Sequence, residues 1–170
     1  EELGISNIVV ASTSGKTGAA ATDFFKNRNL IIVTHSTGFA KPDDQQLRPE
    51  LREKIEQSGA RILTCLHALG GVGRAVRKKL ATYQMEEILA YSLRVFGEGT
   101  KVAVEITLMA ADAGLISTKE PCLSLGGTAQ GVDTVLLVKP AHAQNFFDLR
   151  ILEILAKPHL SFFFDAETTK

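Results

Sequence analysis

The chain has 170 residues, which is long enough to bury a substantial core and suits one domain. Its residues are 45% hydrophobic and 22% charged, and 19 basic side chains balance 19 acidic ones. This balance argues against a nucleic-acid partner or a membrane-binding patch. No apolar run approaches the roughly 18 residues of a membrane span. Because no secretory signal is visible either, we expect a cytoplasmic protein.

The two cysteines, Cys65 and Cys122, lie far apart within apolar runs, so we interpret both as buried, reduced core residues. No Cys-x-x-Cys or His-rich spacing indicates a metal site, and none is predicted. The chain opens at Glu1 without a methionine, almost directly on a strand, so we expect that earlier residues are missing. We treat residues 1–170 as one domain with a tail at 161–170, whose three consecutive phenylalanines pack either on the body or on a partner subunit.

In the first part of the chain, short β-branched runs alternate with helical segments. Buried strands are predicted at Asn7–Ser12, Asn29–His35 and Arg61–Leu66, helices at Thr17–Phe25 and Pro49–Ser58, and a loop at Ser36–Leu47. The second helix has Pro49 at its start and Gly59 just past its end, the usual asymmetry. Strand, helix, strand, helix, strand implies parallel pairing with right-handed crossovers.

In the second part of the chain, helices come first. A helix is predicted over Thr82–Phe96. The run Lys101–Ala113 fits both an alternating strand and a helical stripe, and its length and the following Gly114 favour a helix. Strands are predicted at Pro121–Gly127 and Asp133–Pro140, and a last helix at Gln144–Ala156. The loop between these two strands is too short for a helical crossover, which needs about a dozen residues, so the fifth strand should run antiparallel to the fourth.

The loop Ser12–Gly18, reading STSGKTG, is the strongest candidate for a ligand site. It follows a strand and opens a helix, so several backbone N–H groups and the positive end of a helix dipole converge there. Hydroxyl donors, a lysine ammonium group and a permissive glycine come from Ser12, Thr13, Ser14, Gly15, Lys16 and Thr17. The P-loop of NTPases is excluded, because it requires a glycine where Val10 stands. The alternative is a capped turn without a ligand.

Two further loops are weaker candidates. The run His67–Arg74, reading HALGGVGR, has a glycine cradle that includes Gly71 and an anion-binding candidate in Arg74. It fails as a dinucleotide fingerprint, because Val76 occupies the place of the third glycine. The run GGTAQG, which begins with Gly126, Gly127 and Thr128, links the fourth and fifth strands. Each of these loops, taken alone, is equally well explained as a turn.

Topology connects these loops. Ligands of open α/β sheets bind beyond the strand carboxyl ends, where the winding direction reverses. If the first three strands are laid down in the order 3-2-1 and the fourth lies beside the first, the reversal falls between strands one and four. STSGKTG and GGTAQG follow these two strands, so we expect them to face each other across one crevice.

Four histidines and two acids of the chain carry side chains of the kind that act in ligand binding or catalysis. His35 and His67 follow parallel strands on the expected ligand edge, where each could orient a ligand, act as an acid or base, or satisfy a buried carbonyl. His142 follows an antiparallel strand and should lie on the opposite edge, and His159 belongs to the tail. Glu105 and Asp112 stand seven residues apart on one helix face. They could form a functional pair, but a polar helix face or a subunit contact is the simpler interpretation.

These motifs resemble the C-terminal α/β domain of pyruvate kinase. Strand, STSGKTG and NLIIVTH match its first half, and GVDTVLLV is similar to its closing strand. HALGGVGR, VAVEITLMAADAGLI, LGGTAQGVDT and PAH…FDLR are similar to small stand-alone archaeal and bacterial proteins of that fold, over about residues 3–158. The resemblance implies a three-layer α/β/α domain with a five-stranded, mostly parallel sheet in the order 3-2-1-4-5, the last strand antiparallel.

The resemblance also implies a ligand. In fungal and animal pyruvate kinases the corresponding loop grips a phosphate of an allosteric sugar bisphosphate, and stand-alone members have been seen with FMN. The residues that fall on this loop are Ser12, Thr13, Ser14 and Thr17, while Lys16 stands at a position that varies. Two features depart from the family: the chain lacks the usual helix before the first strand, and residues 161–170 match nothing in it. The catalytic barrel of pyruvate kinase is absent, so phosphoenolpyruvate chemistry is not expected.

The sequence therefore predicts a protein that binds the phosphate of a mononucleotide, with FMN as cofactor and without a defined reaction. The alternatives are an enzyme with His35 and His67 as acid–base groups over a phosphorylated ligand, and a regulatory or oligomerisation subunit that binds a sugar-phosphate effector. We expect the protein to bind a phosphorylated small molecule and to form a homo-oligomer.

Overall fold

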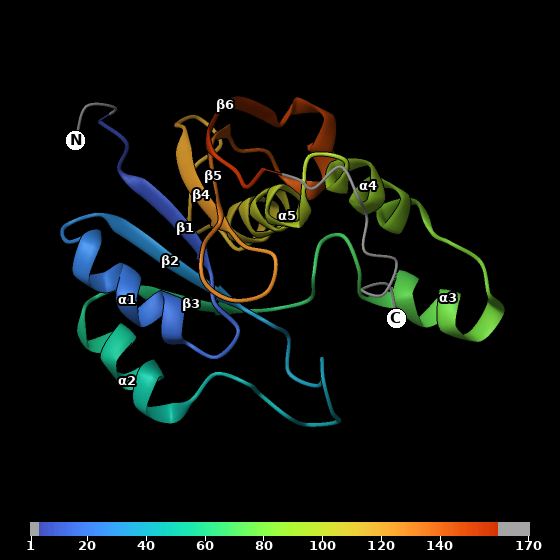
Figure 1. Ribbon diagram of the computed structural model, residues 1–170, viewed down its shortest axis with the longest axis horizontal. Coiled ribbons are helices and arrows are strands. Elements are labelled where there is room, and N and C mark those ends of the chain that lie inside the picture. The colour runs from blue at the N-terminus through green and yellow to red at the C-terminus, as the bar shows by residue number, and fades with distance from the viewer. Residues whose placement is uncertain (1–3, 160–170) are drawn as a thin grey trace.

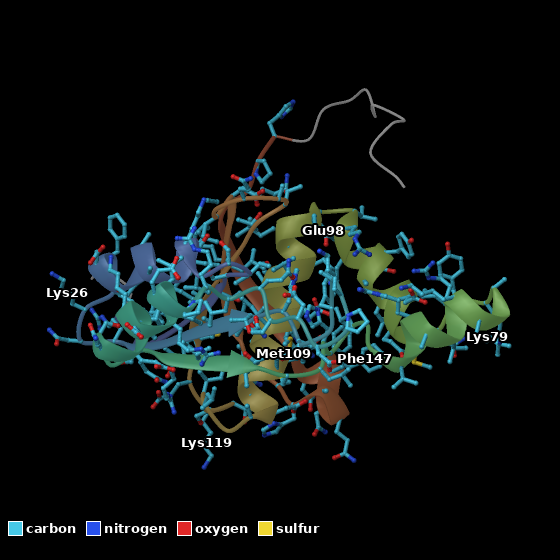
Figure 2. All side chains as sticks on the ribbon, turned by 90° about the horizontal axis from the view of Figure 1, so that it is seen from below. Lys26, Lys79, Glu98, Met109, Lys119 and Phe147 are labelled. Atoms are coloured by element: carbon cyan, nitrogen blue, oxygen red, sulfur yellow. The ribbon has the colours of Figure 1, made fainter. Side chains whose placement is uncertain are left out.

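The computed structural model describes residues 4–159, which fold into one mixed sheet flanked by helices. Figure 1 shows α1 and α2 over one face of the sheet and α5 on the other, with α3 and α4 beyond α5. Figure 2 places Lys26, after α1, and Lys79, on α3, toward opposite ends of the molecule. Among the described residues, no helix is long and apolar enough to cross a membrane.

The first half folds as predicted, as two strand–helix units and a third strand. The elements are β1 (Asn7–Ala11), α1 (Lys16–Phe24), β2 (Asn29–Thr34), α2 (Pro49–Gln57) and β3 (Arg61–Thr64). β1 pairs in parallel with β2, and β2 in parallel with β3. The apolar runs predicted these strands because both faces of β1 and β2 are covered by helices and nearly all their side chains are buried.

The middle of the chain is helical and contains one helix that the sequence did not predict. The helices are α3 (Val72–Leu80), α4 (Met85–Arg94) and α5 (Glu98–Asp112). α3 begins within the run interpreted as a glycine loop, so Arg74 stands on a helix. The ambiguous run at Lys101–Ala113 is helical, in agreement with the prediction, because α5 packs against β4 and β1 through a buried stripe.

The last part corrects the sequence analysis. β4 (Cys122–Gly126) pairs in parallel with β1, and β5 (Thr134–Lys139) antiparallel with β4, as predicted. The predicted helix at Gln144–Ala156 is wrong: a 3-10 helix, η1 (Ala143–Asp148), is followed by the strand β6 (Arg150–Ala156), antiparallel to β5. The sheet thus has six strands in the order β3-β2-β1-β4-β5-β6, instead of five.

Two apolar clusters hold the layers together. Val10, Ile32 and Ile55 belong to the cluster between the sheet and α1 and α2. Val9 and Leu108 belong to the larger cluster between the sheet and α5. The pleat sends Val9 and Val10 to opposite faces of β1, which is how one strand serves both clusters.

The two cysteines differ in burial. Cys122 is fully buried on β4, and burial raises the pKa of its thiol to about 12. Cys65 is only half-buried, at the end of β3, and burial raises its pKa as well. Both thiols are free, and the prediction of a buried core residue holds fully only for Cys122.

Candidate functional site

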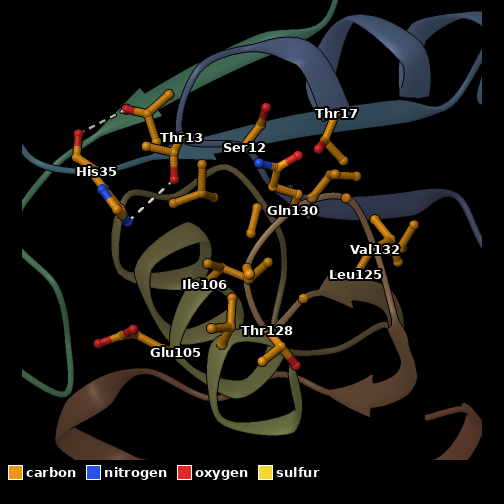
Figure 3. Close-up of a pocket in the computed structure, with 18 of the residues that line it drawn as sticks. Ser12, Thr13, Thr17, His35, Glu105, Ile106, Leu125, Thr128, Gln130 and Val132 are labelled. Carbon is orange, nitrogen blue, oxygen red and sulfur yellow. Dashed lines mark hydrogen bonds between the residues drawn. The ribbon is translucent and has the colours of Figure 1, made fainter. Parts of the chain in front are cut away.

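A cavity of about 1110 Å³ opens at the carboxyl ends of β1, β2 and β4. Small-molecule pockets commonly enclose about 300–1000 Å³, so this volume is ample for a ligand of nucleotide size. The residues after β1, namely 12–14, 16 and 17, form one wall, and residues 127–132 form another. Figure 3 shows Ser12, Thr13 and Thr17 from the first wall and Thr128 and Gln130 from the second. The two loops therefore line one cavity, as the strand order predicts.

The loop after β1 is held in one shape by its own hydrogen bonds. The Ser12 hydroxyl, which is buried, accepts a hydrogen bond of 2.9 Å from the backbone N–H of Gly18 in the first turn of α1. Gly15 has φ +92°, and a Cβ there would lie 2.6 Å from Leu47 and 2.8 Å from Leu51. Glycine is thus required at this position for both conformation and space.

Five backbone N–H groups of this loop donate to no acceptor in residues 4–159. They belong to Thr13, Ser14, Gly15, Lys16 and Thr17. The first N–H groups of a helix have no partner within it, and the helix dipole adds a partial positive charge at the same end. Ser12 occupies only the N–H of Gly18, so the remaining donors are left for solvent or for an anion.

His35 is fixed against this loop. Its Nδ1 lies 2.8 Å from Oε1 of Gln46, and its Nε2 lies 3.3 Å from the Thr13 hydroxyl. The bond to Gln46 Oε1 places the proton on Nδ1, so that Nε2 accepts from Thr13 when the ring is neutral. Figure 3 shows this link between His35 and Thr13. The loop after β2 thereby joins the wall after β1.

On the other side of the cavity, a buried charge cluster surrounds His67. Lys101 and Glu105, one turn apart on α5, form an ion pair of 2.5 Å with side chains 6% and 5% exposed. Glu105 also accepts the backbone N–H of Leu69 at 3.0 Å, and its carboxylate lies 3.8 Å from Nδ1 of His67. His67 Nε2 is buried without a protein partner among the described residues. Burial lowers the pKa of His67, and the nearby carboxylate of Glu105, which raises it, does not compensate.

His67 gives the free energy of unfolding a pH dependence of defined sign. An unfolded histidine titrates near 6.5, whereas the folded protein protonates His67 only at lower pH. Between these two pKa values the unfolded chain binds more protons, so the contribution of His67 is complete above pH 6.5 and is lost as the pH falls below it. We expect His67→Gln to flatten this part of the profile in urea unfolding at about pH 7.5 and about pH 5.5. His142→Gln, at an exposed histidine outside the cavity, is the control, and an unchanged slope in His67→Gln would contradict the assignment.

The wall at residues 127–132 is also fixed from within. Asp133 accepts the backbone N–H of Thr128 at 2.8 Å and the hydroxyl of Thr134 at 2.7 Å. Burial raises the pKa of Asp133, but these hydrogen bonds outweigh burial and the pKa is lowered. A carboxylate is therefore retained there at neutral pH, where it closes the turn between β4 and β5.

The charge of the cavity lining favours an anionic ligand. Lys16, Arg74, Arg94 and Lys101 bring four positive charges, and Glu98 and Glu105 bring two negative ones. The two carboxylates are paired with Arg94 and Lys101. Lys16 and Arg74 make no ion pair within residues 4–159, so the lining carries a net charge of two positive units with both histidines neutral.

Most of the predicted site residues line this cavity. Those that do are Ser12, Thr13, Ser14, Lys16, Thr17, His35, His67, Arg74, Gly127 and Thr128. Three predicted glycines, Gly15, Gly71 and Gly126, are not among the lining residues, and a Cβ on each would collide with a neighbouring side chain or backbone atom. Glu105 lines the cavity, but Asp112 is exposed and lies 3.2 Å from His142, outside the cavity. The two acids therefore form no pair.

Sequence reasoning missed Phe39 and Lys101, which also line the cavity. Lys101 carried a visible signal, since Lys101 and Glu105 are one turn apart in an otherwise apolar helix, the spacing of a helical ion pair. Phe39 stands in the irregular segment between β2 and α2, where hydrophobic periodicity carries no information.

The sequence pattern of the pyruvate kinase, alpha/beta domain, matches residues 1–138. The match includes every element from β1 to β4 and all of β5 except Lys139, and with them both cavity walls and the helices between them. The chain belongs to this family. The observed sheet agrees with the order expected for a pyruvate kinase alpha/beta domain. The strand β6 lies beyond the matched residues, and this is the part of the fold that the resemblance did not predict.

Proposed function

We propose that this chain binds a phosphorylated small molecule, a mononucleotide such as FMN, with its phosphate on the loop 12–18. The observation that carries the proposal is the group of five backbone N–H donors at residues 13–17 that have no acceptor within residues 4–159. The hydroxyls of Ser14 and Thr17, the Lys16 ammonium group and the helix terminus face the same cavity. Phosphate prefers this combination of donors and positive charge.

The rest of the cavity suits the remainder of a mononucleotide. Its volume of about 1110 Å³ exceeds what a free phosphate needs. Apolar side chains such as Ile106 and Leu125 line it alongside the polar groups, which is the usual composition of a small-molecule site. In this proposal the loop 12–17 holds the phosphate. FMN would supply hydride or single-electron transfer, and the protein its binding and orientation.

The same cavity supports a second candidate, an enzyme acting on the bound ligand. The observation that favours it is the buried Nε2 of His67, which has no partner in the described part of the chain, while Glu105 lies near Nδ1 of the same ring. A neutral imidazole beside a carboxylate is suited to take a proton from a ligand. In a His67→Ala protein that still binds ligand, loss of turnover would favour the enzyme.

The double variant Thr13→Ala/Ser14→Ala tests the phosphate site. We expect it to weaken FMN binding by about 1–3 kcal/mol, because the Ser14 hydroxyl donor and the Thr13–His35 contact are lost while the backbone donors remain. The measurement is a fluorescence titration with FMN, supported by the FMN-dependent shift in melting temperature.

The control is Thr82→Ala/Ser92→Ala, which removes the same two side-chain types from exposed positions outside the cavity. Unchanged FMN affinity in Thr13→Ala/Ser14→Ala would refute the assignment of the loop. If the wild-type protein ignores FMN while a sugar phosphate raises its melting temperature, the mononucleotide is wrong and the phosphate site stands.

A further inference from the structure

Three aromatic rings gather at the carboxyl ends of β2 and β3. The ring of Phe39 lies 4.0 Å from the ring of His35, tilted by 33°, and 5.0 Å from the ring of His67, inclined by only 20°. The centroids of the two imidazoles are 5.4 Å apart. The guanidinium carbon of Arg74 lies 4.9 Å from the centre of the Phe39 ring. All four side chains line the cavity.

Three separate segments bring these four side chains together, because His35 and Phe39 share the segment between β2 and α2. His35 follows β2, Phe39 stands in the segment before α2, His67 follows β3, and Arg74 lies on α3. Phe39 remains 38% exposed, although it packs on two rings and a cation. A large apolar ring left partly open inside a cavity offers area for a second ring to cover.

This cluster begins one side chain away from the phosphate loop. His35 contacts the Thr13 hydroxyl at 3.3 Å through Nε2, and the ring of the same histidine packs on Phe39. If the phosphate of a ligand binds the loop, a linker as long as a sugar would therefore let the rest of that ligand reach the cluster. The cavity is continuous between the two places, since both belong to one lining.

The polar atoms of the cluster indicate which kind of ligand ring would fit there. His67 Nε2 is buried with no partner in the described residues, and a buried polar atom of this kind is satisfied by a donor or acceptor from a ligand. Arg74, which forms no ion pair within residues 4–159, lies over the Phe39 ring and offers N–H donors there. A flat ring with nitrogen and oxygen atoms on its edge meets both requirements, whereas a plain sugar phosphate has no ring face to stack.

We propose that Phe39, His67 and Arg74 form the subsite for the heteroaromatic ring of the phosphorylated ligand. The ligand ring packs against the exposed part of the Phe39 side chain, while Arg74 and His67 Nε2 contact polar atoms on the edge of the ligand ring. This inference rests on the proposed function and extends it, because it assigns the ring end of the ligand to residues separate from those that hold the phosphate.

The test compares Phe39→Leu with the wild-type protein, using FMN and ribose 5-phosphate as probes. Leucine retains apolar bulk but removes the ring face. We expect FMN affinity to fall roughly tenfold and the quenching of flavin fluorescence on binding to decrease, while ribose 5-phosphate competes as well as before. Phe39→Trp, which restores a ring, is expected to recover FMN affinity.

The matched control is Phe147→Leu, at a phenylalanine on η1 that is 78% exposed and outside the cavity (Figure 2). Equal FMN affinity and quenching in wild type and Phe39→Leu would overturn the ring subsite and leave the phosphate site standing. An equal loss for FMN and ribose 5-phosphate would also overturn it, because Phe39 would then act through the loop. If the wild-type protein binds neither probe, the proposed function fails and the subsite falls with it.

Discussion

Replacing Lys101 with methionine is expected to lower the free energy of unfolding by about 3–5 kcal/mol. The substitution leaves the Glu105 carboxylate, whose side chain is 5% exposed, without its cation in a site that is largely shielded from water. Glu105 keeps the N–H of Leu69, but one neutral donor does not offset the desolvation of a charge. The measurement is urea unfolding at neutral pH.

Two further variants make this result specific. In Lys101→Met/Glu105→Gln the buried charge is removed while an oxygen remains for Leu69, so most of the lost stability should return. Arg52→Met breaks a pair of the same i,i+4 spacing whose side chains are 40% and 54% exposed, and about 1 kcal/mol at most is expected there. If Lys101→Met lowers the free energy of unfolding no more than Arg52→Met does, the buried ion pair is screened by solvent like a surface ion pair.

Gly126→Ala is expected to destabilise the protein by about 3 kcal/mol or more. A Cβ at Gly126 would overlap the carbonyl oxygen of Gly99 and lie 2.9 Å from the backbone nitrogen of Ala103. Both atoms belong to the backbone of α5, which cannot move aside as a side-chain end can. α5 would have to separate from β4, which would also open the main apolar cluster.

The control for this variant is Gly70→Ala. Gly70 has no positive φ, and the nearest atom to its added Cβ is the flexible end of Arg74 at 3.4 Å. We expect a change within about 0.5 kcal/mol there. Thermal and urea unfolding of both variants provide the comparison, and a Gly126→Ala protein as stable as Gly70→Ala would contradict the close approach of α5 to β4.

The parallel part of the fold was predictable because local pattern and tertiary environment agree there. β1 and β2 are apolar on both sides because helices cover both faces of the sheet. A short apolar run of this kind is typical of a buried strand in a parallel sheet. The strand β6 was not predictable in this way. Its Ile151, Ile154 and Leu155 also fit helical spacing. The segment forms a strand because it pairs with the free edge of β5, where Ile151 lies opposite Val138 and Ile154 opposite Leu136, with two register shifts along the pair.

The site was predictable where its chemistry is local. Backbone donors at the start of α1 follow from a strand–loop–helix pattern and a glycine, so STSGKTG could be identified from the residues alone. His67 was predicted to lie on the ligand edge, but the environment of its side chain could not be predicted. Its Nε2 without a partner among the described residues, its lowered pKa and its position beside Glu105 arise from packing against segments distant in sequence. Phe39 was equally hidden, since only folding places it between two histidines.

The bond between Ser12 and Gly18 bears on how fast a ligand can bind. It already closes the loop in the free protein, and Arg48 donates its backbone N–H to the Ser14 carbonyl at 3.3 Å to hold the loop from outside. A loop that is shaped beforehand spends little conformational entropy when an anion arrives. For the phosphate ligand that we propose, association would then depend on diffusion and on the attraction of the cavity charge instead of on loop rearrangement, and added salt should slow binding more than it speeds dissociation.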